Sequence, residues 1–136
     1  MDKTKNESHS SKCRFGPNTG SKCRFDPNTG IKKYKTKEIC DYAFTAQKQA
    51  FELGIAPPVY ERIDELSFRV GIANTSFFMD NLEPGKYYNK YFPHLHTPLK
   101  KIMENNPLKT WGPDGVDLAR HNLGIWEGRI VMIDFS

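Results

Sequence analysis

The side chains best suited to chemistry gather near the end of the chain, where Asp117 is followed five residues later by Asn122. Asp134 comes next, directly after the apolar run 130–133. Carboxylate and amide oxygens are hard ligands of the kind that Mg²⁺ takes in phosphate-handling sites. A further carboxylate in such a site can orient a hydroxyl group that accepts a phosphoryl group. These three residues could therefore hold a metal ion and serve phosphoryl transfer.

The order Asp, Asn, apolar strand, Asp resembles the catalytic loop and magnesium motif of the protein-kinase superfamily. The resemblance implies that Asp117 is the catalytic residue that orients the accepting hydroxyl, and that Asn122 and Asp134 are ligands of Mg²⁺. It covers the chain from about residue 11 and is closest to atypical and small phage-encoded kinase-like proteins. It implies a minimal phosphotransferase that uses ATP and Mg²⁺.

Upstream segments extend this resemblance to the small lobe and the hinge. The run 53–60 is similar to the junction between the small-lobe helix and the fourth strand. The run 77–82 is similar to the fifth strand leading into the hinge. By that analogy Met79 is the gatekeeper, and backbone groups of Asp80 and Leu82 bind the adenine edge.

The same analogy needs a lysine on the third strand that reaches the ATP phosphates. Lys33 and Lys35 share one face of the run 31–35, and either could do so. We favour Lys35 as the catalytic lysine, because Tyr34 before it then packs inward. The polar partner of this lysine on the following helix stays open among Glu38, Asp41 and Gln47. The sequence also departs from the family. It has no G-x-G-x-x-G loop, Gly115 stands where kinases carry His, and Ser136 stands in place of Gly.

The elements that must position these residues begin with a tandem repeat. Residues 11–20 and 21–30 are identical except that Gly16 stands where the second copy has Asp26. Each copy ends in Pro-Asn-Thr-Gly, a sequence typical of a turn. With the run 31–35, the repeat predicts a three-stranded antiparallel meander.

From Thr36 the apolar spacing becomes helical, which predicts a helix capped by Thr36 and ended by Gly54. Further elements are expected beyond the prolines at 57 and 58. They are short strands at 59–62, 67–72 and 76–79, a helix at 96–106, and a hairpin of strands 123–126 and 129–133.

The predicted fold class is α+β: a kinase-like small lobe, built of an antiparallel sheet and one long helix, joined by a hinge to a truncated large lobe. We expect a flexible tail at 1–10, the small lobe at 11–79, and the large lobe at 80–136. The chain stops just after the magnesium-binding Asp134. Such a truncation would leave apolar surface that favours self-association.

The composition of the chain limits the kinds of partner and the cellular location that we expect. The chain has 136 residues, 38% of them hydrophobic, which is enough for one packed domain. No apolar run is long enough to cross a membrane, and Cys13, Cys23 and Cys40 form no C-x-x-C pair. Without a signal peptide, a cytoplasmic location is expected, in the host if the protein is viral.

The charge distribution bears on nucleic acid as a partner. Through Glu38 there are ten Lys and Arg against four Asp and Glu, and after it ten against twelve. A basic segment can attract nucleic acid, but charge alone is a weak basis and we do not expect that partner. We expect a nucleotide and a protein acceptor or partner. The alternative is a catalytically inactive kinase-like protein that docks on a host or viral partner.

Overall fold

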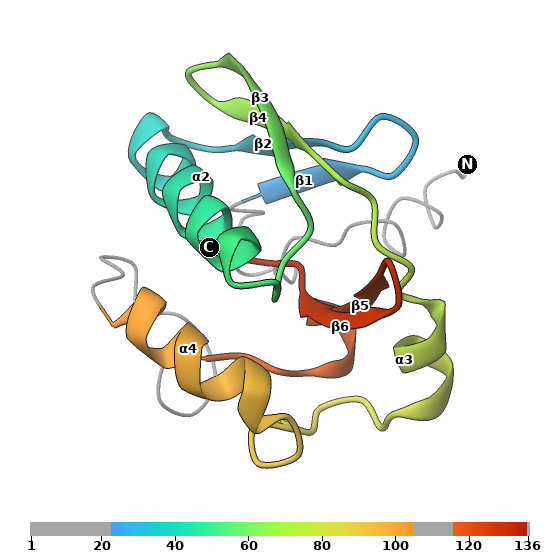
Figure 1. Cartoon of the computed structure of the whole chain (residues 1–136). Coiled ribbons are helices and arrows are strands. Elements are labelled where there is room, and N and C mark those ends of the chain that lie inside the picture. The colour runs from blue at the N-terminus through green and yellow to red at the C-terminus, as the bar shows by residue number, and fades with distance from the viewer. Residues whose placement is uncertain (1–22, 105–115, 136) are drawn as a thin grey trace.

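The computed structural model describes residues 23–104 and 116–135. The fold is α+β, with an antiparallel sheet and one long helix above a smaller part made of two helices and a hairpin (Figure 1). In chain order the elements are β1 (Cys23–Asp26), β2 (Ile31–Tyr34), α2 (Lys37–Glu52), β3 (Val59–Asp64), β4 (Ser67–Val70), α3 (Ser76–Asn81), α4 (Pro93–Met103), the 3₁₀ turn η3 (Arg120–Asn122), β5 (Leu123–Trp126) and β6 (Arg129–Met132).

The described part of the second copy of the repeat folds as predicted, as a strand and a turn, and the strand β2 follows it. β1 pairs with β2 across the turn, and the antiparallel sheet continues in the order β1-β2-β4-β3. Asp26 closes the turn, because its carboxylate accepts a hydrogen bond from Asn28 N at 2.9 Å and its carbonyl accepts one from Gly30 N at 2.8 Å. The first copy, 11–20, and the first strand of the predicted meander lie outside the described residues.

Gly30 at the end of this turn should tolerate no side chain. Its φ is +80°, and a Cβ built on it would lie 2.4 Å from Val70 O. We expect Gly30→Ala to lower the free energy of unfolding by about 3 kcal/mol, since backbone strain and a backbone clash add. Gly128→Ala is the matched control, because Gly128 has a φ of +79° but nothing within 4 Å of a built Cβ. Urea unfolding would contradict this account if both variants lost the same stability.

Helix α2 confirms the predicted switch from strand to helix. Thr36 is its N-cap, with Oγ1 accepting a hydrogen bond from Ile39 N at 3.1 Å. The helix ends at Glu52, and Gly54 follows with a φ of +79°, as expected of a glycine beyond a helix end. The residues it buries recur at helical spacing and are Ile39, Cys40, Ala43, Ala46, Gln47 and Ala50.

The predicted strand at 76–79 is wrong, because these residues form helix α3. Asn74 starts the helix: its Oδ1 accepts hydrogen bonds from both the backbone N and the Oγ of Ser76. The aromatic residues that suggested a strand serve the helix instead, with Phe78 buried and Phe77 exposed. The sheet therefore ends at Val70, and 71–75 is the linker to the rest of the fold.

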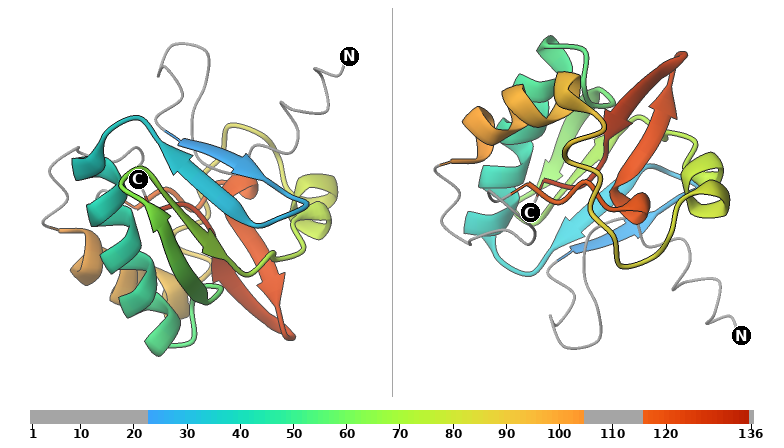
Figure 2. Two further views of the ribbon diagram at one scale, coloured as in Figure 1. Left: turned by 90° about the horizontal axis from the view of Figure 1, so that it is seen from above. Right: turned by 90° about the horizontal axis from the view of Figure 1, so that it is seen from below.

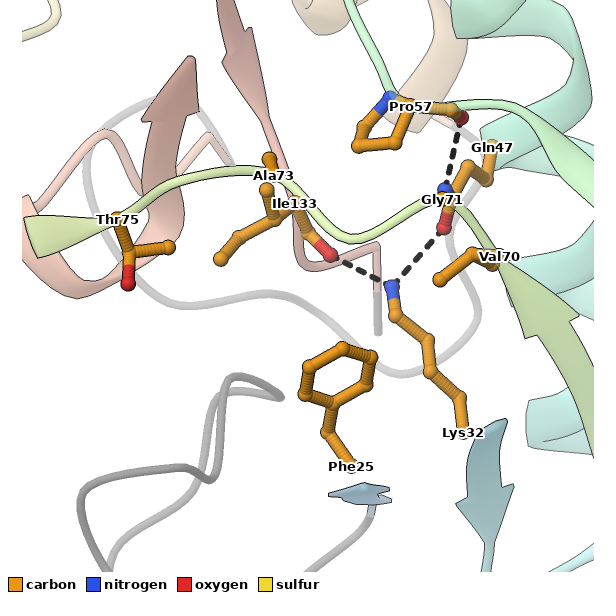
Figure 3. Close-up of a pocket in the computed structure, with 9 residues that line it drawn as sticks. All are labelled: Phe25, Lys32, Gln47, Pro57, Val70, Gly71, Ala73, Thr75 and Ile133. Atoms are coloured by element: carbon orange, nitrogen blue, oxygen red, sulfur yellow. Dashed lines mark hydrogen bonds between the residues drawn. The ribbon is translucent and has the colours of Figure 1, made fainter. Parts of the chain in front are cut away.

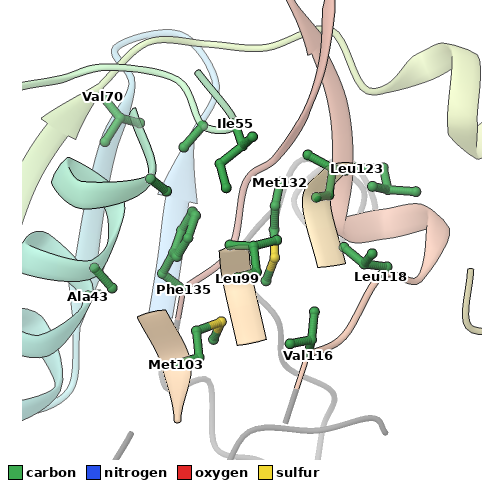
Figure 4. Close-up of a cluster of buried hydrophobic side chains, with 14 of the residues drawn as sticks. Ala43, Ile55, Val70, Leu99, Met103, Val116, Leu118, Leu123, Met132 and Phe135 are labelled. Carbon is green, nitrogen blue, oxygen red and sulfur yellow. The ribbon is translucent and has the colours of Figure 1, made fainter. Parts of the chain in front are cut away.

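The lower part packs directly beneath the sheet and α2. Helix α4 runs beside α2 (Figure 1 and Figure 2), and it begins and ends three residues earlier than predicted. Phe135 is completely buried between Ala43 of α2 and Leu99 of α4 (Figure 4). One continuous core therefore joins both parts of the molecule. None of the helices within 23–104 and 116–135 is long and apolar enough to span a membrane.

The hairpin β5–β6 confirms the predicted strand pair and fastens the two parts together. Met132 N donates to Ile55 O at 3.0 Å, beside the end of α2. Asn74 and Ile125 exchange two backbone hydrogen bonds, which tie the linker to β5. These bonds hold the hairpin against the segment after α2 and against the linker.

Candidate functional site

Lys32 is the lysine that the fold encloses. It lies on the inner face of β2, fully buried, and its Nζ donates hydrogen bonds to Gln47 Oε1 at 2.9 Å and to Ile133 O at 2.6 Å (Figure 3). Gln47 comes from α2, and Ile133 comes from the segment after β6. The ammonium group therefore lies where the sheet, the long helix and the C-terminal segment meet, next to Asp134.

Burial disfavours the charged form of Lys32. Desolvation lowers its pKa from 10.5 to about 8, although the negative charge of Asp134 acts in the opposite direction. Asp134 itself is buried. A cation held in this way, with much of its hydration removed, interacts strongly with an anion that enters the site.

The lowered pKa predicts that stability rises with pH. Between the folded pKa of about 8 and the unfolded value of 10.5, the unfolded chain binds the proton more readily, so raising the pH favours the folded state. From about pH 7 to about pH 9.5 the gain is roughly 2 kcal/mol. Urea unfolding should show this gain when the wild type is compared with Lys32→Met. The free energy of unfolding of the wild type, minus that of the variant, should increase with pH. A constant difference would contradict the assigned burial of Lys32.

Asn122 brings the predicted catalytic loop next to the residue before Asp134. Its side-chain Nδ2 donates to Asp117 O at 3.0 Å, and its backbone O accepts from Ile133 N at 2.9 Å. The side chains of Asp117, Asn122 and Asp134 are all buried. The backbone of Asn122 thus lies beside that of Ile133, the residue before Asp134, and its side chain reaches the backbone of Asp117.

Asn122 and Asp134 fit a site for a Mg²⁺ ion that also binds phosphate. Asn122 Oδ1 is buried and accepts no hydrogen bond from the described residues, so one hard oxygen is left for a ligand. Asp134 can supply a carboxylate oxygen. Mg²⁺ commonly takes only one or two protein ligands and completes its shell with phosphate and water. Residues 23–104 and 116–135 contain no group of three His, Cys, Asp or Glu side chains placed to hold a metal.

Lys33 and Lys35, the two lysines expected at the phosphates, are exposed. Side chains alternate along a strand, so Lys33 points to the face opposite Lys32, and Lys35 follows just beyond the strand. Tyr34 does pack inward, as expected. Because Tyr34 points inward, Lys32, two residues earlier on the same strand, also lies on the inner face. This alternation is the sequence signal that could have identified Lys32.

Of the three polar residues considered on α2, Gln47 is the one that contacts a lysine of β2, namely Lys32. Asp41 is engaged elsewhere, since its carboxylate accepts from Lys37 Nζ at 2.8 Å and from Arg62 Nη2 at 2.7 Å. These two cations hold the pKa of Asp41 below its usual range. Glu38 is exposed on the first turn of the helix.

The expected hinge at Met79, Asp80 and Leu82 is also displaced. These residues lie on or just after α3, and the carbonyls of Met79 and Leu82 accept hydrogen bonds from Arg120 Nη1 at 2.7 and 3.1 Å. Asp80 is exposed. The carbonyls of Met79, the predicted gatekeeper, and of Leu82, whose backbone was predicted to bind adenine, therefore anchor the Arg120 side chain.

A small pocket instead lies between the sheet and the linker, next to Lys32 Nζ. Its walls come from β1, β2, α2, the linker and the segment after β6 (Figure 3), and they are formed by Phe25, Lys32, Gln47, Pro57, Val70, Gly71, Ala73, Thr75 and Ile133. The lining is apolar apart from Lys32, Gln47 and Thr75. Its free space is that of roughly one water molecule.

Comparisons of this chain with protein-family models, with curated proteins and with solved structures found no match. The candidate site consists of a buried cation, a buried amide oxygen with no hydrogen-bond partner among the described residues, and two buried carboxylates.

Proposed function

We propose that this protein is a kinase-like phosphotransferase that uses ATP and Mg²⁺, with a protein hydroxyl as acceptor. The observation that supports this best is the place of Lys32. Its Nζ donates to the carbonyl of Ile133, the residue immediately before Asp134. An anion-binding cation and a metal-binding carboxylate thus adjoin, which is what a metal-bound polyphosphate requires.

In this proposal each buried polar group has one task. Lys32 Nζ binds oxygens of the ATP phosphates, and Asn122 Oδ1 with an Asp134 oxygen holds Mg²⁺. When bound, Mg²⁺ supplies neutralisation of the phosphate oxygens. Asp117 orients the acceptor hydroxyl and takes its proton. The acceptor oxygen then bonds to the γ-phosphorus as the bond to the β,γ-bridging oxygen breaks, and ADP leaves.

The pocket at the linker is the place for the base. Val70, Gly71 and Ala73 form one wall, and Phe25 from the edge strand β1 forms another. Because the free space is so small, a purine enters only if a wall moves. Phe25 is half-buried on a strand that, within the described residues, pairs only with β2, so it is the wall residue that can yield at the lowest cost.

Titration of the full chain with ATP, in the presence and absence of Mg²⁺, tests the proposal. We expect measurable binding with Mg²⁺ and much weaker binding with EDTA, because Asn122 and Asp134 would hold the metal, which would neutralise the phosphate oxygens. Incubation with γ-labelled ATP should then show label on the protein itself or on an added protein acceptor. Absence of nucleotide binding under both conditions would exclude the proposal.

One observation favours the alternative of a kinase-like binding protein without catalysis, namely the narrow pocket at the linker. In that case Mg²⁺ and ATP would not bind, while a host or viral partner protein would. Both versions place the protein in the cytoplasm, where ATP and its acceptors are found. Binding of Mg·ATP without any transfer of label would favour a nucleotide-dependent binding protein over an enzyme.

A further inference from the structure

The loop between α3 and α4 is hydrogen-bonded to the stretch of chain that carries Asp117 (Figure 1). Asn89 is buried, with its Nδ2 donating to Val116 O at 3.0 Å and its Oδ1 accepting from Leu118 N at 3.3 Å. Tyr88 N donates to Leu118 O at 2.9 Å. These bonds reach the residues on both sides of Asp117, so the position of the loop relative to that residue is fixed.

Four side chains of this loop are exposed and form what we call the lysine–tyrosine patch: Lys86, Tyr87, Lys90 and Tyr91. Tyr87 is 41% exposed and Tyr91 is 61% exposed. Lys86 Nζ lies 5.4 Å from the centre of the Tyr88 ring and 5.8 Å from that of Tyr91. Large aromatic side chains on a surface supply contact area of the kind that protein interfaces favour.

The positive charge of the patch is not offset by carboxylates in its own stretch of chain. Between Glu83 and Glu104 there are four lysines and no Asp or Glu. Neither Lys86 nor Lys90 forms an ion pair with the residues 23–104 and 116–135. Such lysines can attract a carboxylate from another molecule. In charge the patch is therefore complementary to a segment rich in Asp and Glu.

We propose that the lysine–tyrosine patch binds an Asp- and Glu-rich segment of a partner protein. The inference deepens the proposed function, on which it rests in one respect: the partner is then the phosphate acceptor, held beside the loop that carries Asp117. A protein is favoured over a nucleic acid, because binding to a phosphate backbone takes a row of cations along the strand. The patch offers only two lysines.

Fluorescence anisotropy tests the inference on the full chain. The probe is a short labelled peptide rich in Glu, and its control is the same peptide with Gln in place of every Glu. The variant is the double substitution Lys86→Gln and Lys90→Gln. Lys100→Gln with Lys101→Gln is the matched control, because both lysines are exposed in the last turn of α4, at the end away from the patch. Neither ATP nor Mg²⁺ is present.

We expect the wild type to bind the Glu peptide and not the Gln peptide. The Lys86 and Lys90 double variant should bind the Glu peptide about fivefold more weakly, since two exposed ion pairs are lost. The Lys100 and Lys101 double variant should bind it like the wild type. Added salt should weaken the binding, because exposed charges are screened.

Equal losses in the two double variants would overturn the inference, because the attraction would then belong to the net charge of the chain. A wild type that binds both peptides alike would overturn it too. So would tighter binding of a single-stranded oligonucleotide that is lost in the Lys86 and Lys90 variant, which would make the patch a nucleic-acid site. Binding of the Glu peptide by a chain that binds no Mg·ATP would support the patch as a docking surface and exclude the proposed phosphate transfer.

Discussion

Replacing Lys32 by methionine is expected to weaken the binding of Mg·ATP by about 10- to 100-fold and to abolish phosphate transfer. The estimate follows from the loss of hydrogen bonds to a charged group, each of about 1.5–3 kcal/mol. The fold should persist because two effects on stability oppose each other. The substitution removes a buried cation, but it leaves Gln47 Oε1 and Ile133 O without the donor they have now.

Lys33→Met and Lys35→Met are the matched controls for this experiment. Both lysines are exposed and lie within three residues of Lys32, so the same charge is removed from the same part of the chain. Calorimetric titration should find their affinity for Mg·ATP close to that of the wild type. A larger loss in Lys35→Met than in Lys32→Met would return the phosphate contact to the lysine that the sequence first suggested.

Replacing Asp134 by asparagine should remove the magnesium dependence of nucleotide binding and stop phosphate transfer. The side chain keeps its volume and loses the negative charge that holds the metal. Loss of the metal's neutralisation of the phosphate oxygens costs several kcal/mol of transition-state stabilisation, so a rate fall of about a thousandfold or more is expected. Thermal unfolding should change little, because the buried segment around Phe135 keeps its packing.

Asp80→Asn is the control for Asp134→Asn, since it removes an equal charge from an exposed position on α3. It should bind Mg·ATP and transfer phosphate like the wild type. The titrations are best run with and without EDTA, because the effect sought is the difference between the two. If a biological effect of the protein survives Asp134→Asn intact, the fold acts as a binding platform and the enzyme proposal has to be abandoned.

Local chemistry accounts for the parts of the fold that were predicted correctly. The Pro-Asn-Thr-Gly turn after Asp26, the Thr36 cap and the two-residue turn at Glu127 and Gly128 are each decided by hydrogen bonds or φ angles within a few residues. Such signals act in the same way in any tertiary context. The sheet, the long helix and the terminal hairpin could therefore be predicted from short stretches of sequence.

Helix α3 shows where local signals were insufficient. The sequence Ser76-Phe77-Phe78-Met79 has the aromatic content of a strand, yet strand formation needs a neighbouring strand with which to pair. Asn74 already pairs with Ile125 at that point, and its side chain accepts a hydrogen bond from the backbone N of Ser76, the first residue of the helix. The linker between the two parts of the fold therefore comes earlier in the chain than the predicted hinge. The pocket lies at this linker.

By itself the sequence determined the composition of the candidate site near the C-terminus, because Asp117, Asn122 and Asp134 lie close together along a short loop and hairpin. Only the tertiary structure decided which lysine and which helix residue join them. Strand alternation places Lys32 on one face of β2 and Lys33 and Lys35 on the other. Which of the two faces is buried depends on α2 and the segment after β6, which cover the face that carries Lys32. For the same reason the sequence could not distinguish Gln47 from Glu38 or Asp41. The helix face that meets the sheet determines which of these residues contacts the lysine.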